Sequence, residues 1–260
     1  MGLRTFGFRA AACCLAGLLM SGGAKAAEVK VMISGGLSAA YRALTPEFEQ
    51  SSGHHLSTAW GPSMGTTQDA IPVRLQRGES ADVLIMVGSA LSELIKQGKV
   101  DPASRVDLVR SPIGMVVRAG AAKPDIGSVD AFKKTLLAAT SVVYSDSASG
   151  VYVGTELFQR LGIADQMQAK SRMIPAEPVA AVVARGEAEI GFQQVSELLP
   201  VPGADFVGPL PEELQKMTVF SAGIVVGSPE PAAAKALIAF LGSPAAAPTL
   251  RTSGLDPIQK

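Results

Sequence analysis

Three short turns in this sequence place serine hydroxyls beside glycines directly after strand-like runs. They are Ser34-Gly35-Gly36, Ser63-Met64-Gly65 and Ser145-Asp146-Ser147-Ala148-Ser149-Gly150. Glycine allows the backbone N–H groups to approach a ligand closely, and each serine hydroxyl adds a hydrogen-bond donor. Helix N-termini that follow such turns favour negative charge. The pattern predicts a binding site for a small anion. The alternative is that the serines cap helices and the glycines only turn the chain.

A fourth polar segment, Gln193-Gln194-Val195-Ser196-Glu197, also follows a predicted strand. Side-chain amides at a strand end can donate hydrogen bonds to ligand oxygens, whereas the alternative is a polar surface loop. Because ligands of open α/β sheets lie beyond the carboxyl ends of the strands, we expect the segment to share a cleft with the three turns. The predicted substrate-binding residues are Ser34, Gly35, Gly36, Ser63, Met64, Ser147, Ser149, Gly150, Gln193 and Gln194.

Other residues with reactive or charged side chains give weaker patterns. His54 and His55 are the only histidines and have no further metal ligands nearby in the sequence, so we expect surface side chains and no metal. Arg74 and Arg77 flank the second turn, where they would either bind a carboxylate or lie on a helix surface.

The elements that must position these turns alternate between strand and helix. Strand-like runs cover 29–33, 56–60, 83–87, 114–118, 141–144, 190–193 and 219–226, and helical periodicity covers 38–50, 69–77, 89–97, 129–138, 150–161, 179–185 and 232–241. This alternation predicts an α/β protein with mostly parallel sheets flanked by helices. We expect two discontinuous lobes with a cleft between them, residues 27–111 plus 223–260 and residues 112–222.

The N-terminus has the pattern of a cleavable secretory signal. Arg4 and Arg9 precede an apolar stretch that ends in Ala24-Lys25-Ala26, which predicts cleavage near Ala26 and a periplasmic mature chain. Both cysteines, Cys13 and Cys14, fall within this segment, so no mature disulfide is expected. Without the signal the net charge becomes slightly negative, which disfavours nucleic acid as a partner. No stretch is apolar for long enough to predict a membrane-embedded chain.

Several landmarks resemble the periplasmic molybdate-binding proteins over nearly the whole predicted mature chain. These are Gly36-Leu37, Ala81-Asp82-Val83, Ser145-Asp146 with Gly150-Val151-Tyr152, and Gly186-Glu187-Ala188 before Gly191. The resemblance implies the type II periplasmic binding protein fold, with two lobes hinged about a cleft. It departs from that family at ligand donors: Gly36 stands where the family has serine, and Gln194 where it has tyrosine.

The four polar segments resemble instead a divergent branch of that family that includes aconitate isomerases. The resemblance implies interconversion of trans- and cis-aconitate by an allylic proton shift, without a cofactor. Such a shift requires a general base. Asp146 is the first candidate, although an Asp before a helix also acts as a cap; Glu177, Glu197 and Tyr152 are further candidates.

Two functions therefore remain open from the sequence. One is an isomerase of a small tricarboxylate, prompted by the altered donors. The other is a non-catalytic binding protein that delivers a small polycarboxylate or a molybdate-type oxyanion to an ABC transporter permease. The fold does not decide between them.

Overall fold

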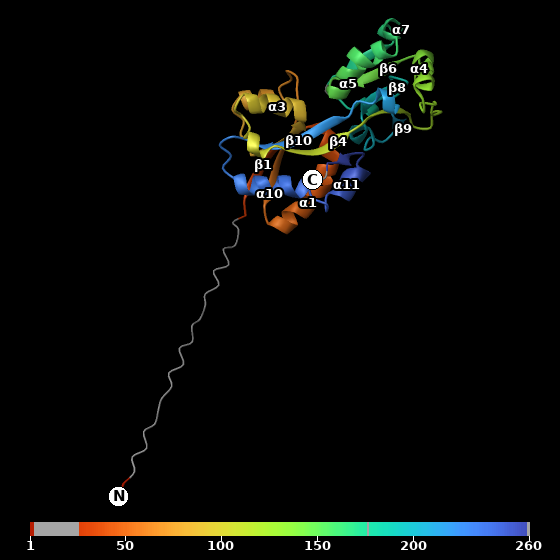
Figure 1. Cartoon of the computed structure of the whole chain (residues 1–260). Coiled ribbons are helices and arrows are strands. Elements are labelled where there is room, and N and C mark those ends of the chain that lie inside the picture. The colour runs from red at the N-terminus through yellow and green to blue at the C-terminus, as the bar shows by residue number, and fades with distance from the viewer. Residues whose placement is uncertain (3–25, 176, 259–260) are drawn as a thin grey trace.

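The computed structural model describes residues 1–2, 26–175 and 177–258. In this part of the chain the strands form two mixed sheets, each flanked by helices, and the sheets lie in two adjoining lobes (Figure 1). The α/β, two-lobed fold expected from the sequence is confirmed. The predicted signal segment and both cysteines fall almost wholly on residues 3–25, outside the described residues.

The first lobe is built on the sheet with strand order β11-β4-β10-β3-β1-β2. β1 pairs in parallel with β2 and β3, whereas β10 runs antiparallel to β3 and β4. The strands of this sheet are β1 (Glu28–Ile33), β2 (His55–Trp60), β3 (Val83–Val87), β4 (Val106–Ser111), β10 (Thr218–Ile224) and β11 (Asp256–Pro257). Its helices are η1 (Gly35–Leu37), α1 (Ser38–Ser52), α2 (Ile71–Gln76), α3 (Gly88–Lys96), η2 (Pro102–Ser104), α10 (Pro231–Leu241) and α11 (Ala247–Thr252).

The second lobe contains the sheet with strand order β7-β6-β8-β5-β9. β6 is parallel to β7 and β8, and β5 is antiparallel to β8 and β9. Its strands are β5 (Ile113–Arg118), β6 (Val142–Ser145), β7 (Ser171–Ile174), β8 (Ile190–Gln194) and β9 (Ala204–Pro209). Its helices are α4 (Val129–Ala138), α5 (Ala148–Tyr152), η3 (Val153–Leu157), α6 (Phe158–Arg160), α7 (Ala164–Gln168), α8 (Val179–Ala184), α9 (Val195–Leu198) and η4 (Glu212–Leu214).

The sequence pattern of β1 and α1 explains how the first lobe is packed. Side chains alternate across a strand, so Val31 and Ile33 of β1 enter the core beneath α1, while Met32 enters the core on the other face of the sheet. α1 buries Leu44 and Phe48 at helical spacing and ends at Gly53, whose left-handed φ of 72° suits glycine. The strand thereby delivers the first serine turn at its carboxyl end.

The chain passes twice between the lobes. β4 continues through Pro112 into β5, and the segment after β9 returns to the first sheet as β10. β10 begins at Thr218, so residues 218–222, expected in the second lobe, pair with strands of the first. An apolar strand has the same local pattern in either sheet, so the sequence does not place this boundary.

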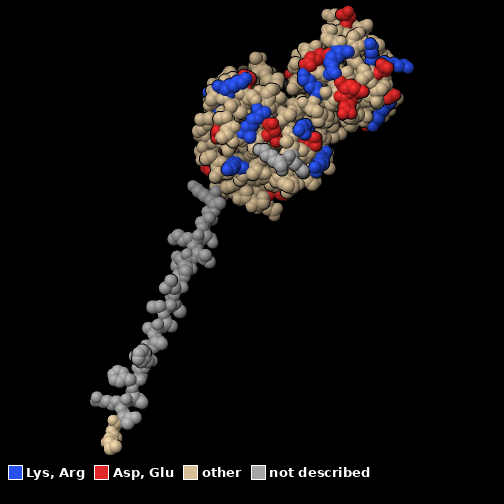
Figure 2. All heavy atoms as spheres, viewed as in Figure 1, with Lys and Arg blue, Asp and Glu red and all other residues tan. Residues whose placement is uncertain are grey.

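The surface of the described residues carries mixed charge. Basic and acidic side chains alternate over both lobes on the face shown in Figure 2, without a continuous basic surface. No helix in the described ranges combines the length and the apolar character needed to cross a bilayer.

Candidate functional site

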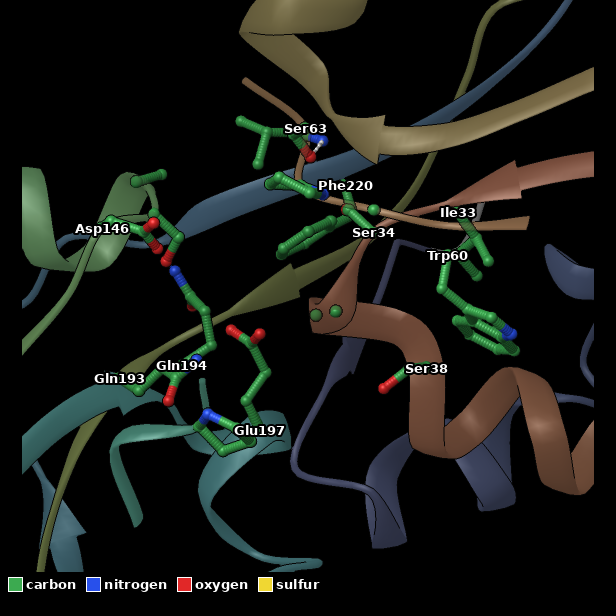
Figure 3. A pocket seen from close by; sticks show the side chains of 18 of the residues that line it. Ile33, Ser34, Ser38, Trp60, Ser63, Asp146, Gln193, Gln194, Glu197 and Phe220 are labelled. Atoms are coloured by element: carbon green, nitrogen blue, oxygen red, sulfur yellow. Dashed lines mark hydrogen bonds between the residues drawn. The ribbon is translucent and has the colours of Figure 1, made fainter. Parts of the chain in front are cut away.

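A cavity of about 460 Å³ lies between the two lobes, at the carboxyl ends of β1, β2, β6 and β8. Figure 3 shows side chains of both lobes facing this space. Residues from all four polar segments line it: Ser34, Gly35, Gly36, Ser63, Met64, Asp146, Ser147, Gln193, Gln194 and Glu197. The structure therefore brings together segments that are up to about 160 residues apart in the sequence.

Ser34 directly follows β1 and has a buried hydroxyl. Its backbone N–H donates to the Ile85 carbonyl oxygen at 3.0 Å, which fixes the start of the turn. The Ser34 side chain is only 4% exposed, and its Oγ has no hydrogen-bond partner among the described residues. A buried hydroxyl without a partner loses about 1–3 kcal/mol of hydration, so this atom suits a ligand oxygen.

Ser63 presents a hydroxyl from the second turn. Its Oγ accepts a hydrogen bond of 2.9 Å from the Val87 backbone N–H, and the residue is buried. A hydroxyl that accepts one bond can still donate its own hydrogen. The bond to Val87 thus holds Ser63 Oγ in place as a donor toward the cavity.

The third turn forms a cluster of three hydroxyls. Ser145 Oγ lies 2.7 Å from Ser147 Oγ and 3.1 Å from Ser149 Oγ. Ser147 lines the cavity, whereas Ser149 is fully buried behind it and Gly150 packs against the backbone of Ser145. Of the three predicted ligand contacts in this turn, Ser147 therefore lies at the surface of the cavity. Ser149 and Gly150 lie behind it and stabilise the turn.

Gln194 lines the cavity but uses its amide in the hinge between the lobes. Its nitrogen donates to Ser111 Oγ at 2.8 Å and to the Ser111 carbonyl oxygen at 3.0 Å, and its oxygen accepts from Thr218 Oγ1 at 2.8 Å. Ser111 ends β4 and Thr218 begins β10, the two strands next to the crossings. Gln194 thus ties together the two crossing segments.

Gln193 holds the carboxylate of Glu197. The Gln193 Oε1 atom accepts a 3.0 Å hydrogen bond from the Val179 backbone N–H, which turns the amide nitrogen toward Glu197. Burial raises the pKa of Glu197 to about 7, although the hydrogen bond from Gln193 opposes the rise and the charge of Asp146 adds to it. Glu197 is therefore an acid with both protonation states populated near neutral pH.

Arg42 is a charged residue of the cavity that the sequence reasoning missed. Its guanidinium lies 3.8 Å from the centre of the Trp60 ring, in a cation–π contact. Among the described residues that line the cavity it is the only Lys or Arg. Arg42 lies four positions after Ser38, another lining residue, on the same face of α1. This helical spacing directly after the first serine turn could have identified Arg42 from the sequence.

The arginines and histidines singled out in the sequence lie elsewhere. Arg74 pairs with Glu79 at 2.5 Å, and Arg77 donates to the Gln68 carbonyl oxygen at 2.6 Å. His54 Nδ1 accepts from the Ala27 backbone N–H at 3.2 Å near the opposite end of β2. None of these side chains lines the cavity.

Two of the other candidate bases have partners of their own. Tyr152 donates its hydroxyl to the Leu214 carbonyl oxygen at 2.6 Å and does not line the cavity. Glu177 lines the cavity but forms an ion pair of 3.1 Å with Arg185. The charge of Asp146 acts on the carboxyl group of Glu197 within the cavity.

Comparison with known proteins places this geometry among solute-binding proteins. Residues 29–256 match the family model described as bacterial extracellular solute-binding protein. The chain is 54% identical over 228 residues to an aconitate isomerase of a Pseudomonas species, an alignment that covers 88% of this chain and 87% of that protein. It is 26% identical over 250 residues to the molybdate-binding protein ModA of Azotobacter vinelandii, which covers 91% and 92% of the two chains.

A solved structure gives the same architecture. The substrate-binding domain of a molybdenum ABC transporter from Clostridium difficile superposes with a TM-score of 0.70 at 18% identity, covering 90% of this chain and all of that one. At this identity the likeness supports the fold and leaves the ligand to be argued from the cavity.

Proposed function

This chain belongs to the family of bacterial extracellular solute-binding proteins, and from that membership and its cavity we propose that it is an aconitate isomerase. It interconverts trans-aconitate and cis-aconitate in the cleft between the lobes. The observation that carries the proposal is the 54% identity to an aconitate isomerase across 88% of the chain, a stretch that contains every residue of the cavity.

The cavity suits a small polycarboxylate. Its volume of about 460 Å³ lies in the usual range for small-molecule sites. Hydroxyls of Ser34, Ser63 and Ser147 line it from both lobes, and Arg42 adds one cation at its wall. Neutral donors stabilise carboxylate oxygens without the desolvation penalty of several buried countercharges.

The reaction needs only proton transfer. Aconitate has a CH2 group and a vinylic CH on either side of its central carbon, each bearing a carboxylate. Removal of a CH2 proton gives an allylic carbanion whose charge spreads into the adjoining carboxylates. Return of a proton at the other end of the allylic system moves the double bond. Donors already directed at those carboxylates stabilise the charge that develops. No electrons are gained or lost, so the chemistry requires no redox cofactor.

We place the mature enzyme in the periplasm after removal of residues 1–26. The family is extracellular, and the N-terminal sequence has the pattern of a secretory signal. The ligand we propose is a tricarboxylate rather than a tetrahedral oxyanion, because Gln194 commits its amide to the hinge and Arg42 supplies a positive charge to the cavity lining.

The test is direct. Purified mature protein is incubated with trans-aconitate, and cis-aconitate is followed by chromatography. Formation of the cis isomer to a constant ratio from either starting isomer supports the isomerase. In parallel, thermal unfolding is measured with trans-aconitate, citrate and molybdate, because a ligand at about 100 times its Kd adds about 2.7 kcal/mol. Stabilisation without turnover would instead support the alternative, a transporter's binding protein.

A further inference from the structure

We propose that Glu197 is the group that removes and returns the proton in this isomerisation. The inference rests on the proposed isomerase and identifies the catalytic acid-base residue, for which sequence reasoning favoured Asp146. Three features of the cavity lead to it: the location of the carboxylate, the bonds that orient it and the charges around it.

Glu197 lies at the junction of the two lobes. It belongs to α9, which directly follows β8 of the second lobe, yet its Oε1 atom lies against the Cα of Gly35 at the end of β1. Figure 3 shows the carboxylate directed into the space between Gln193 and the first serine turn. A ligand held by Ser34 is therefore within reach of this group.

Neighbouring hydrogen bonds fix α9 and the carboxylate. Ser196 Oγ donates to the Gly36 carbonyl oxygen at 2.7 Å, which anchors α9 to the first lobe. Gln193 is locked by the Val179 N–H and directs its amide nitrogen at Glu197. A catalytic group needs this kind of support, because small errors in its location slow proton transfer strongly.

The electrostatic surroundings allow Glu197 both to accept and to release a proton. The charged residues that share the cavity with it are Arg42, Asp69, Asp146 and Glu177. A single group that both removes and returns a proton must be available in its ionised and its neutral form. The pKa of Glu197, about 7, meets this requirement near neutral pH. Asp146 contributes to this pKa through its charge.

The proton and electron balance closes with this one residue. The Glu197 carboxylate takes a proton from the CH2 carbon, and the electron pair of the broken C–H bond enters the allylic system. The carboxylic acid thus formed returns the proton to the carbon that was vinylic, and a new C–H bond forms there. Glu197 ends the cycle ionised, and substrate and product differ only in the location and geometry of the double bond.

The main test compares Glu197→Gln with Glu93→Gln, an exposed acid outside the cavity that pairs with Lys96. We expect E197Q to lower kcat roughly 10²- to 10⁴-fold, the usual contribution of a general base. It should still be stabilised by trans-aconitate in thermal unfolding. E93Q should isomerise the substrate like the wild type.

A second measurement leaves Glu197 unchanged. Removing the charge of Asp146 lowers the pKa of Glu197, so the acid limb of the kcat/KM profile of Asp146→Asn should move to lower pH. Full turnover by E197Q, or a turnover-dead D146N beside an active E197Q, would overturn the assignment. Absence of turnover in the wild type would instead refute the isomerase itself, so the two failures are distinguishable.

Discussion

The carboxylate of Glu197 and the Cα of Gly35 touch across the two lobes, so closely that a methyl group on Gly35 would overlap Glu197 Oε1. Gly35 follows β1 of the first lobe, and Glu197 lies in α9 after β8 of the second lobe. The two residues therefore meet only when the second lobe packs against the first serine turn. This contact places the Glu197 carboxylate at the first serine turn, where the Ser34 hydroxyl is also buried.

Gly35→Ala should therefore displace Glu197. We expect kcat to fall by about tenfold or more, since proton transfer is sensitive to the location of the base, while thermal unfolding changes less. Gly242→Ala is the matched control, because a Cβ there would have its nearest neighbour, the Ile238 carbonyl oxygen, at 3.5 Å. Steady-state kinetics of both variants decide the matter: equal kcat values for G35A and G242A would contradict the arrangement.

Replacement of Glu197 should make the protein more stable at alkaline pH. The folded state raises the pKa of this carboxyl from 4.5 to about 7. Its contribution to stability is therefore complete below pH 4.5 and is lost as the pH rises through 7, where the desolvated group ionises. The free energy of unfolding, measured with urea, should be compared for E197Q and the wild type at pH 5 and at pH 8. From pH 5 to pH 8 the difference should shift in favour of E197Q by on the order of 2 kcal/mol. A difference that stays constant with pH would argue against the raised pKa.

Ser34→Ala should weaken ligand binding without harming the fold. Its Oγ is buried without a partner among the described residues, so removing it from the free protein leaves no broken bond. A lost hydrogen bond to a charged carboxylate should reduce affinity for trans-aconitate roughly tenfold or more. Ser243→Ala removes another buried hydroxyl that lacks a partner in the described part of the chain, and Ser243 lies outside the cavity. Calorimetric titration of S34A and S243A should separate them; equal affinities would remove Ser34 from the site.

Arg42→Gln should weaken the binding of the trianion. Loss of a charged hydrogen bond of this kind costs about 1.5–3 kcal/mol, so Kd should rise roughly 10- to 100-fold. Arg110→Gln is the control, since Arg110 is paired at 3.7 Å with Asp256 and does not line the cavity. Fluorescence of Trp60, on which Arg42 stacks, offers a convenient titration signal. An R42Q affinity equal to that of R110Q would show that Arg42 does not contact the ligand.

The periodicity of the sequence predicted most strands and helices that carry the cavity, because local alternation reports which face of an element is buried. The Ser34, Ser63 and Ser147 turns could be identified for the same reason: they follow apolar strand runs. The strands β4, β7, β9 and β11 were missed, because β4 and β9 have partly exposed faces and β7 and β11 are very short, and both features weaken the periodic signal.

The amino-acid sequence by itself thus determined the fold class, the family resemblance and the set of serine turns. Only the tertiary structure decided which strands pair, that β10 returns to the first sheet, and that Gln194 belongs to the hinge. It also decided the chemistry of Glu197, because the pKa of a carboxyl depends on desolvation and on charges supplied by distant segments. Gly35 and Asp146 acquire their influence on Glu197 only when the two lobes meet, and no local pattern records that proximity.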